Sequence, residues 1–285
     1  MRIQFTKMHG CGNDYIYVDM FKTPAFDFEK AAVALSDRHF GIGGDGIILV
    51  CPSDKADAKM RIFNADGSEG MMCGNGIRCV GKYVYDSGIA KKDVLKIDSL
   101  SGVKTLQMTI ENGKAVAARV DMGPAILTPA LIPVNLPGET AVGIPINADG
   151  IQWKMTCVSM GNPHAVIFVD EDPMELDLPA IGSKFEHHPL FPQRVNTEFV
   201  RVIDDHTLQM RVWERGSGET WACGTGTCAS AVAAVLNGYC RKGEDILVHL
   251  RGGDLVIRYT DETVYMTGPA ATAFTGSVEL SDYGI

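Results

Sequence analysis

Residues 69–76 of the chain read EGMMCGNG, and residues 219–226 read ETWACGTG. Both segments fit the pattern E-x-x-x-C-G-x-G, and their cysteines, Cys73 and Cys223, are 150 positions apart. A short glycine-rich phrase that occurs twice carries little weight alone. The neighbouring sequence therefore has to show whether the two copies belong to a duplicated fold.

The similarity extends beyond the cysteine segments. At the same offset, residues 61–64 (RIFN) match residues 211–214 (RVWE). Upstream, residues 12–19 and 161–170 each open with Gly-Asn, continue as an apolar run and close with Asp. Three matched segments in one order and at nearly one spacing predict an internal duplication. Because the copies are long, we expect two similar domains, since a solenoid needs many short repeats.

Length and composition fit a soluble enzyme of two domains. The chain has 285 residues, of which 46% are hydrophobic and 21% charged, values typical of globular proteins. A net charge of -9 without a basic stripe argues against nucleic acid and anionic membrane surfaces as partners.

Targeting signals and metal motifs are both lacking in the sequence. No apolar run is long enough to span a bilayer, and residues 1–8 lack the apolar core of a secretion signal. We therefore expect a cytoplasmic location, in which the 8 cysteines are reduced. No C-x-x-C pair occurs, so we expect no metal site and no thioredoxin-like activity.

Strand patterns outnumber helix patterns along the chain. Apolar periodicity predicts a helix over residues 28–39 and one directly after each cysteine segment. The helix after Cys223 is apolar on nearly all sides, so we expect strands to surround it. Strands are predicted at residues 2–8, 14–19, 47–50, 59–63, 154–159, 164–169, 198–203, 207–213, 245–250, 254–259 and 263–267. The excess of predicted strands over predicted helices indicates the α+β class. We interpret the proline-rich residues 124–145 as the connection between the domains.

A cysteine that opens a C-G-x-G segment at the start of a helix is in a setting that favours a reactive thiol. Glycines let the backbone present consecutive N–H groups, and the helix N-terminus adds partial positive charge. Both effects lower a thiol pKa. A single such cysteine is more often an ordinary buried residue, but two at matched positions favour function. The other cysteines are expected to be structural: Cys11, Cys51, Cys79, Cys157, Cys228 and Cys240.

Residues 41–46 (GIGGDG) imitate the G-x-G-x-x-G motif of dinucleotide-binding folds. That motif needs a strand before it and a helix after it. Here a predicted helix precedes the segment and a predicted strand follows it. We therefore do not assign nucleotide binding to this loop.

Several polar residues near the cysteine segments are candidate ligand groups. Four asparagines lie at predicted strand ends or turns, where asparagine also serves turn geometry: Asn13, Asn64, Asn162 and Asn196. Glu214 and Arg215 could hold the ammonium and carboxylate of an amino acid, or form a surface pair. His164 occupies the repeat position of Tyr15, so a role near the thiols is open.

Six segments in order resemble diaminopimelate epimerase over nearly the full chain. They are residues 8–15 (MHGCGNDY), 63–69 (FNADGSE), 73–79 (CGNGIRC), 161–164 (GNPH), 194–199 (RVNTEF) and 214–226 (ERGSGETWACGTG). The resemblance implies an α+β fold of two pseudo-symmetric domains, each a mixed β-sheet curled around a central α-helix, with the active site in the cleft between them. It places the first domain at residues 1–121 plus 269–285 and the second at 122–268, and it implies a homodimer.

The resemblance also implies an activity and its residues. The family comprises isomerases that interconvert LL- and meso-diaminopimelate without pyridoxal phosphate or another cofactor, in lysine and peptidoglycan precursor biosynthesis. By matched motif, Cys73 and Cys223 are the catalytic residues, and His164 and Glu214 tune the thiols. Substrate contacts carry over to Asn13, Asn64, Gly74, Asn75, Asn162, Asn196, Glu214, Arg215, Gly224 and Thr225. The chain departs at Gly46, where some members carry a glutamine that reaches the substrate, and at Tyr15, which is often Phe.

Two thiols explain how an α-carbon can be inverted without a cofactor. One thiolate removes the α-proton from one face while the opposite thiol delivers a proton to the other, and the roles swap in reverse. A proline or hydroxyproline racemase uses the same pairing and is the alternative. Glu214 and Arg215 favour a substrate with an additional charged end. A metal- or redox-binding module would need close cysteine pairs, and a pyridoxal phosphate enzyme would need a Schiff-base lysine.

Overall fold

The computed structural model describes residues 1–285, and the chain divides into two compact units. Unit 1 comprises Met1–Val120 and Thr267–Ile285, and unit 2 comprises Asp121–Met266. The chain therefore leaves unit 1 once and returns to it once.

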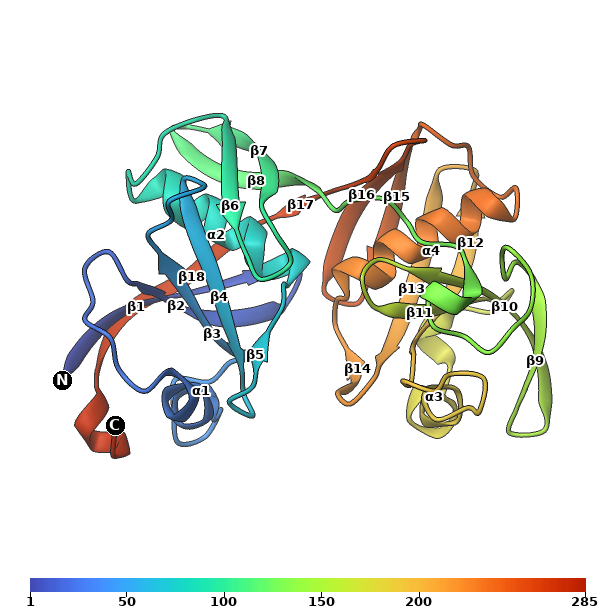
Figure 1. Ribbon diagram of the computed structural model, residues 1–285, viewed down its shortest axis with the longest axis horizontal. Coiled ribbons are helices and arrows are strands. Elements are labelled where there is room, and N and C mark those ends of the chain that lie inside the picture. Colours follow the sequence, from blue (N-terminus) through green and yellow to red (C-terminus); the bar gives the residue numbers. More distant parts are fainter. The chain divides into compact units, whose positions relative to one another are not determined.

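Unit 1 holds the N-terminus, the C-terminus and the first cysteine segment (Figure 1). Its elements are β1 (Arg2–Gly10), β2 (Asn13–Asp19), α1 (Phe28–Ser36), β3 (Gly46–Cys51), β4 (Ala58–Asn64), β5 (Glu69–Gly70), α2 (Gly74–Asp86), β6 (Val94–Asp98), β7 (Lys104–Glu111), β8 (Lys114–Asp121), β18 (Ala271–Glu279) and the 3-10 helix η3 (Leu280–Tyr283).

Unit 2 holds the second cysteine segment. Its elements are η1 (Pro129–Leu131), β9 (Ile144–Ala148), β10 (Ile151–Ser159), β11 (Pro163–Phe168), η2 (Pro173–Glu175), α3 (Leu178–Glu186), β12 (Asn196–Asp204), β13 (Thr207–Glu214), β14 (Gly218–Thr220), α4 (Gly224–Leu236), β15 (Asp245–Leu250) and β16 (Gly253–Tyr259). Strand β17 (Val264–Pro269) begins in unit 2 and ends in unit 1.

Strand pairing repeats from unit to unit, which confirms the predicted duplication. The parallel pairs β2–β3 and β4–β6 of unit 1 recur as β11–β12 and β13–β15 of unit 2. The antiparallel pairs β3–β4 and β4–β5 recur as β12–β13 and β13–β14. Each unit thus has a mixed sheet, as the α+β class requires.

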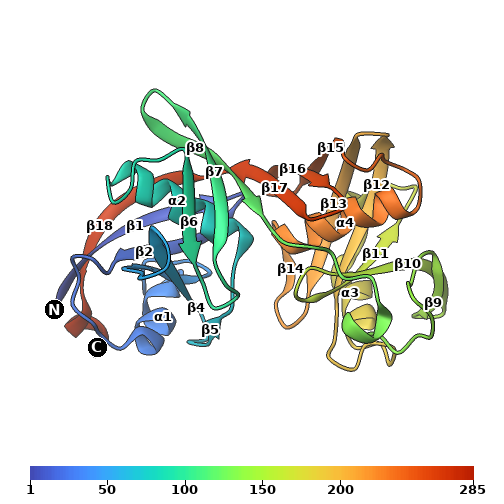
Figure 2. The ribbon, with the colours of Figure 1, turned by 45° about the horizontal axis from the view of Figure 1, so that its top comes forward.

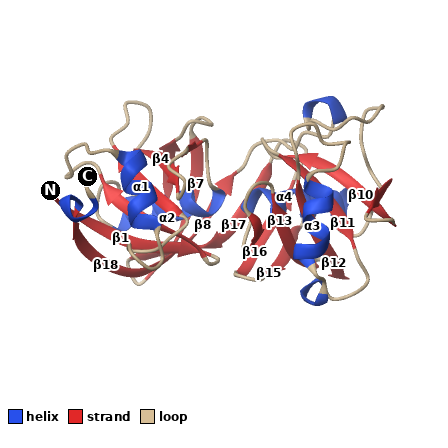
Figure 3. Cartoon of the chain, turned by 90° about the horizontal axis from the view of Figure 1, so that it is seen from below, coloured by secondary structure: helices blue, strands red, loops and turns tan.

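A helix lies within the curl of strands in each unit (Figures 2 and 3). Strands β1, β2, β3, β4, β6 and β7 contact α2, and strands β10, β11, β12, β13, β15 and β16 contact α4. Because strands cover α4 from several sides, its consecutive residues 226–234 are all buried, as its apolar sequence predicts. The expectation of a sheet curled around a central helix is confirmed.

The other face of each sheet carries a second helix. In unit 1, Ile47 and Leu49 of β3 pack with Ala31 and Leu35 of α1. In unit 2, Phe199 of β12 packs with Phe185 of α3. Residues that alternate along β3 and β12 therefore face the two helices in turn. Ile48 and Glu198 point to the central-helix side, where each approaches the first turn of that helix.

Two expectations about the elements were wrong. The helix predicted over residues 28–39 ends at Ser36, because the Asp37 carboxylate accepts the N–H groups of His39 and Phe40 and closes a turn. Residues 124–145 are no connection between units. Their apolar side chains Ile132, Val134 and Ala141 are buried in the core of unit 2.

Each predicted strand overlaps an observed one. The elements that were not predicted are α3 and the strands β5, β6, β7, β8, β9, β14 and β18. None of the helices combines the length and the apolar character that a membrane-spanning helix needs.

Candidate active site

Cys73 and Cys223 are the N-cap residues of α2 and α4. Both have extended backbone angles, with φ -131° and ψ 118° at Cys73 and φ -117° and ψ 108° at Cys223. The sulfur of each accepts an N–H from the third residue of its helix, Gly76 at 3.3 Å and Gly226 at 3.4 Å. This hydrogen bond and the helix dipole both favour a thiolate over a thiol.

The last glycine of each cysteine segment lets the helix approach the sheet. A Cβ atom at Gly76 would lie 2.6 Å from Cδ1 of Ile48, and one at Gly226 would lie 2.4 Å from Oε1 of Glu198. Neither position has room for a side chain. The last glycine of the C-G-x-G pattern is thus explained by close packing of the first helical turn on β3 or β12.

Around Cys73, a network of charged residues fixes one asparagine. The sulfur donates to Oδ1 of Asn13 at 3.3 Å, and Nδ2 of Asn13 donates to Oδ2 of Asp45 at 2.7 Å. Arg38 binds Asp45 at 2.9 Å and Asp14 at 2.7 Å, and the buried Lys7 lies 2.5 Å from Asp14. The Asn13 amide is therefore held with its oxygen toward Cys73.

Hydrogen bonds from Arg38 and Lys7 set the charge of Asp14. Burial alone would raise the pKa of this carboxyl, but the two cations outweigh it and lower the pKa below its ordinary value. Asp14 is thus a stable anion that anchors the loop behind Asn13.

Around Cys223, hydrogen bonds link four residues one after another. Oγ1 of Thr225 lies 3.5 Å from the sulfur, and Nδ2 of Asn162 donates to this hydroxyl at 3.3 Å. Nε2 of His164 lies 3.0 Å from Oδ1 of Asn162. The structure therefore places His164, Asn162 and Thr225 in sequence behind the second thiol.

Burial and negative charge act against ionisation of Cys223. Burial raises the pKa of this thiol well above its ordinary value, and the charges of Glu214 and Glu198 raise it further. Burial likewise raises the pKa of Glu214, although a hydrogen bond from Thr220 at 2.5 Å opposes the shift. A thiolate at Cys223 therefore depends on the donors around it.

Asn196 and Arg215 are joined through the backbone. Oδ1 of Asn196 accepts the Arg215 N–H at 3.0 Å, and Nδ2 donates to the Pro163 carbonyl at 3.0 Å. The Arg215 guanidinium donates to the Gln193 carbonyl at 3.1 Å. Asn196 thus fixes the loop that carries Glu214 and Arg215.

The remaining predicted residues lie beside the cysteines or at a strand end. Gly74 and Asn75 form the first turn of α2, and Gly224 and Thr225 that of α4. Asn64 ends β4 and donates to Ser68 at 3.1 Å. Within each unit the predicted residues are thus held by local hydrogen bonds near the thiol or at the end of a neighbouring strand.

The position of Gly46 explains why this chain carries no glutamine there. Its φ is 156°, and a Cβ atom would lie 2.2 Å from the Phe63 carbonyl oxygen and 3.0 Å from Cα of Asn64. The backbone at this point excludes any side chain.

Sequence reasoning missed two residues that hold the site. Asp45 lies inside the glycine-rich loop that we set aside as a false nucleotide motif, yet it anchors Asn13. Glu198 is fully buried and lies 2.7 Å from Nδ1 of His164. A signal for Glu198 existed, since its counterpart at the repeat offset is the apolar Ile48.

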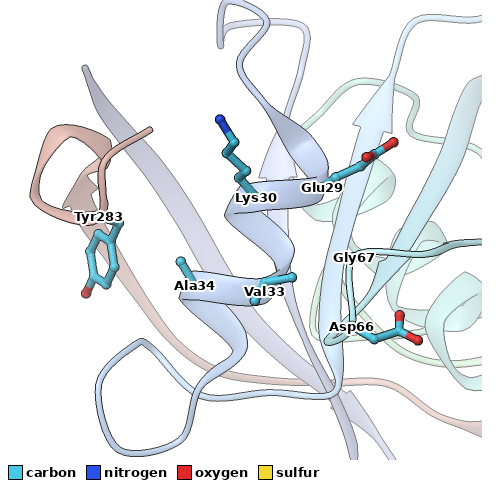
Figure 4. Close-up of a pocket in the computed structure, with 7 residues that line it drawn as sticks. All are labelled: Glu29, Lys30, Val33, Ala34, Asp66, Gly67 and Tyr283. Atoms are coloured by element: carbon cyan, nitrogen blue, oxygen red, sulfur yellow. The ribbon is translucent and has the colours of Figure 1, made fainter.

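A surface hollow lies beside α1. It is lined by Glu29, Lys30, Val33, Ala34, Asp66, Gly67 and Tyr283 (Figure 4). None of these seven residues is a predicted site residue.

The fold is that of known racemases. A solved structure of a probable proline racemase from Agrobacterium radiobacter, with bound carbonate, superposes with a TM-score of 0.75 at 16% identity, over 98% of this chain and 93% of that chain. At such low identity the likeness shows the fold alone, the two-domain α+β architecture shared with racemases and epimerases.

Sequence comparison identifies the family. The family model of diaminopimelate epimerase matches residues 5–128 and 156–273. A diaminopimelate epimerase from Acetivibrio thermocellus is 54% identical over 285 residues, and one from Agathobacter rectalis is 52% identical over 287 residues. Both alignments cover 98% of this chain and 100% of the relative. The chain belongs to the diaminopimelate epimerase family and is an isomerase, which confirms the resemblance.

Proposed function

We propose that this chain interconverts LL- and meso-diaminopimelate without a cofactor, with Cys73 and Cys223 as the acid and base. The observation that carries the proposal is the matched placement of the two cysteines. Each is the N-cap of a buried helix and accepts the N–H of a glycine. Such a placement supports a thiolate at either sulfur.

The reaction moves one proton off the α-carbon and another onto its opposite face. The working state has one thiolate and one thiol, and the two exchange roles when the reaction reverses. The reaction therefore requires that both Cys73 and Cys223 act on the α-carbon of one substrate.

Negative charge that develops on the substrate needs donors nearby. As the α-proton leaves, charge spreads onto the α-carboxylate. The N–H groups of Gly74 and Asn75, and those of Gly224 and Thr225, lie at helix N-termini and suit an anion. We assign these backbone groups to the reacting carboxylate.

Polar side chains then select the substrate. We assign Asn13, Asn64, Asn162, Asn196, Glu214 and Arg215 to the amino and carboxyl groups of diaminopimelate. An acidic and a basic residue side by side suit the distal amino-acid end of this substrate. His164 and Glu214 are assigned to the control of thiol ionisation.

A proline or hydroxyproline racemase remains the second candidate, since the fold is shared with a probable proline racemase. Relatives above 50% identity carry the name diaminopimelate epimerase. Proline also has no distal charged end for Glu214 and Arg215. Both points favour diaminopimelate.

We also propose a cytoplasmic homodimer that serves lysine and peptidoglycan precursor biosynthesis, with neither nucleic acid nor membrane as partner. The candidate dimer surface is β18, where Phe274 is exposed beside Phe5. Sedimentation of Phe274→Glu against the unaltered protein tests this surface, and an unchanged oligomeric state would argue against it.

The activity is tested with purified protein, LL-diaminopimelate and no added cofactor, with separation of the stereoisomers over time. We expect meso-diaminopimelate to form at a rate unaffected by added pyridoxal phosphate. L-proline and trans-4-hydroxy-L-proline are run in parallel. Turnover of either of them, with none of diaminopimelate, would contradict the proposal.

A further inference from the structure

Glu198 is the one fully buried carboxylate close to Cys223 to which no role has been assigned. Its residue is wholly inaccessible, and its Oε1 atom lies 2.7 Å from Nδ1 of the equally buried His164. The same oxygen would lie 2.4 Å from a Cβ atom at Gly226, the residue that donates to the Cys223 sulfur. Burying such a group is unfavourable unless it is paired.

The internal repeat shows that the fold does not require this charge. Glu198 corresponds to Ile48 at the repeat offset. Glu198 lies opposite Val166 in the parallel pair β11–β12, and Ile48 lies opposite Tyr17 in the matching pair β2–β3. In unit 1, Ile48 packs against Gly76 of the central helix. At the equivalent place in unit 2, Glu198 packs against Gly226. The fold therefore accepts an apolar residue at the position of Glu198. The carboxylate of Glu198 is not required for folding, so we look for another role.

The hydrogen bonds fix how many protons the Glu198–His164 pair holds. Nδ2 of Asn162 donates to Thr225, so Oδ1 of Asn162 faces His164 and must accept. Nε2 of His164 therefore carries a proton. The 2.7 Å contact between Nδ1 and Glu198 contains a second proton. The pair is thus neutral overall. Because the Thr225 oxygen accepts from Asn162, its hydroxyl can donate to the Cys223 sulfur, 3.5 Å away.

We propose that Glu198 is a positioning residue for Cys223. It fixes the ring and the protonation of His164, so that donors run from His164 through Asn162 and Thr225 to the sulfur. The partner of one imidazole nitrogen decides where the ring carries its proton. Without Glu198 the ring is released, the Asn162 amide can reverse, and the Thr225 hydroxyl turns away from Cys223. The link to turnover rests on the proposed function, whereas the effect on the thiol does not.

Other titratable groups face the same site and have to be considered. Glu214 projects from β13 and Cys157 from β10, while His164 comes from β11. Burial raises the pKa of Cys157 to about 12, and the charge of Glu198 contributes to this shift. Burial and the charge of Glu214 raise the pKa of Cys223, and the charge of Glu198 raises it further. A purely through-space role for Glu198 therefore predicts that its removal makes Cys223 more acidic, which is the opposite of our expectation.

The test measures the pH dependence of Cys223 alkylation by iodoacetamide, without substrate. Cys73→Ala serves as the background, and peptide mass spectrometry follows Cys223 alone. We expect Glu198→Ile, which copies the residue of the repeat, to move the midpoint up by about one pH unit, with about tenfold less thiolate below it. The plateau rate at high pH should be unchanged, because access to the sulfur is unaltered.

Two variants separate positioning from charge and from packing. Glu198→Gln keeps a hydrogen-bonding partner for Nδ1 and should restore the midpoint of the background protein. In a His164→Phe background, Glu198→Ile should have no further effect, because the two residues act in series. A downward shift shared by Glu198→Ile and Glu198→Gln would show a charge effect only, and unchanged midpoints in both would show a packing role. Either result overturns the proposal.

Turnover of LL-diaminopimelate by the Glu198 variants, with Cys73 intact, completes the experiment. We expect the acid limb of kcat/KM to move up with the alkylation midpoint in Glu198→Ile and to return in Glu198→Gln. If the unaltered enzyme fails to turn over this substrate while the alkylation shifts still hold, the proposed function is wrong and the assignment of Glu198 stands.

Discussion

The two catalytic candidates have the same backbone setting but different side-chain partners. Asn13 presents its amide oxygen to Cys73, so it accepts from a protonated thiol. Asn162, its repeat counterpart, instead donates to Thr225, which lies beside Cys223. The duplication has thus kept the thiols and changed what surrounds them. The anchors of the two asparagines, Asp45 and His164, differ accordingly.

Asp45→Ala should impair catalysis by releasing Asn13. The carboxylate holds the Asn13 amide at 2.7 Å and has no other assigned role in the reaction. Because misplaced groups in an active site reduce rates steeply, we expect kcat/KM for LL-diaminopimelate to fall about 10- to 100-fold. Asp54→Ala, at an exposed aspartate, is the control. Equal activity of the two variants would show that Asp45 does not position Asn13 for catalysis.

Glu214→Gln should make Cys223 more acidic. Burial raises the pKa of Cys223 and the Glu214 charge raises it further, so neutralisation of Glu214 lowers that pKa. We expect the midpoint of Cys223 alkylation to move to lower pH. Glu219→Gln is a matched control from the adjoining strand β14, since the Glu219 carboxylate is paired with Arg211 at 2.8 Å. A midpoint that rises, or that moves equally in both variants, would contradict this reading of Glu214.

Sequence alone located the thiols but not their supports. Cys73 and Cys223 stand out because the same pattern occurs twice, and pattern is a property of sequence. Asp45 and Glu198 matter through contacts with Asn13 and His164, which lie 32 and 34 positions away in the chain. Such contacts follow from strand pairing, which a single sequence does not specify.

Among the helices and strands, the first turns of α2 and α4 are the parts most constrained by packing. Each starts at a cysteine cap and passes a strand so closely that only glycine fits. The neighbours differ, because Gly76 meets Ile48 and Gly226 meets Glu198. The contact between Gly76 and Ile48 is apolar, so it can be tested by changing side-chain volume alone.

Gly76→Ala should destabilise unit 1 through one methyl group. The added Cβ would lie 2.6 Å from Cδ1 of Ile48, and overpacking of this kind costs about 1–3 kcal/mol. Alanine is the better helix former by about 0.5–1 kcal/mol, which offsets part of the loss. Adding Ile48→Val removes the Cδ1 atom and should recover part of the free energy of unfolding. Urea denaturation of the single and double variants measures this, and strictly additive effects would refute the contact.

Element prediction succeeded where periodicity was strong and failed where side chains acted locally. The apolar run of α4 predicted a helix inside a sheet, and the structure has one. The end of α1 depends on the Asp37 carboxylate, which captures two backbone N–H groups. Residues 124–145 suggested a linker because proline breaks regular structure, yet Ile132 and Val134 insert into a core.

For the whole molecule, the duplication explains why each unit carries a cysteine at the start of its central helix. Matched strand pairings surround matched helices in the two units, and each helix begins at a cysteine. Membership in the diaminopimelate epimerase family follows from relatives of 54% and 52% identity over nearly the entire chain. Two thiols, one from each unit, are what an inversion by two bases requires.

The most direct test follows LL-diaminopimelate in D2O with the unaltered enzyme, Cys73→Ala and Cys223→Ala. With both cysteines present, each molecule of product should carry one solvent deuterium at the inverted α-carbon from the first turnover. Loss of either thiol removes one of the two proton carriers, so each variant should epimerise at least about 100-fold more slowly. Circular dichroism of the variants should match the unaltered protein. Near-normal epimerisation by either variant, or product that retains its original α-hydrogen, would contradict the two-thiol account.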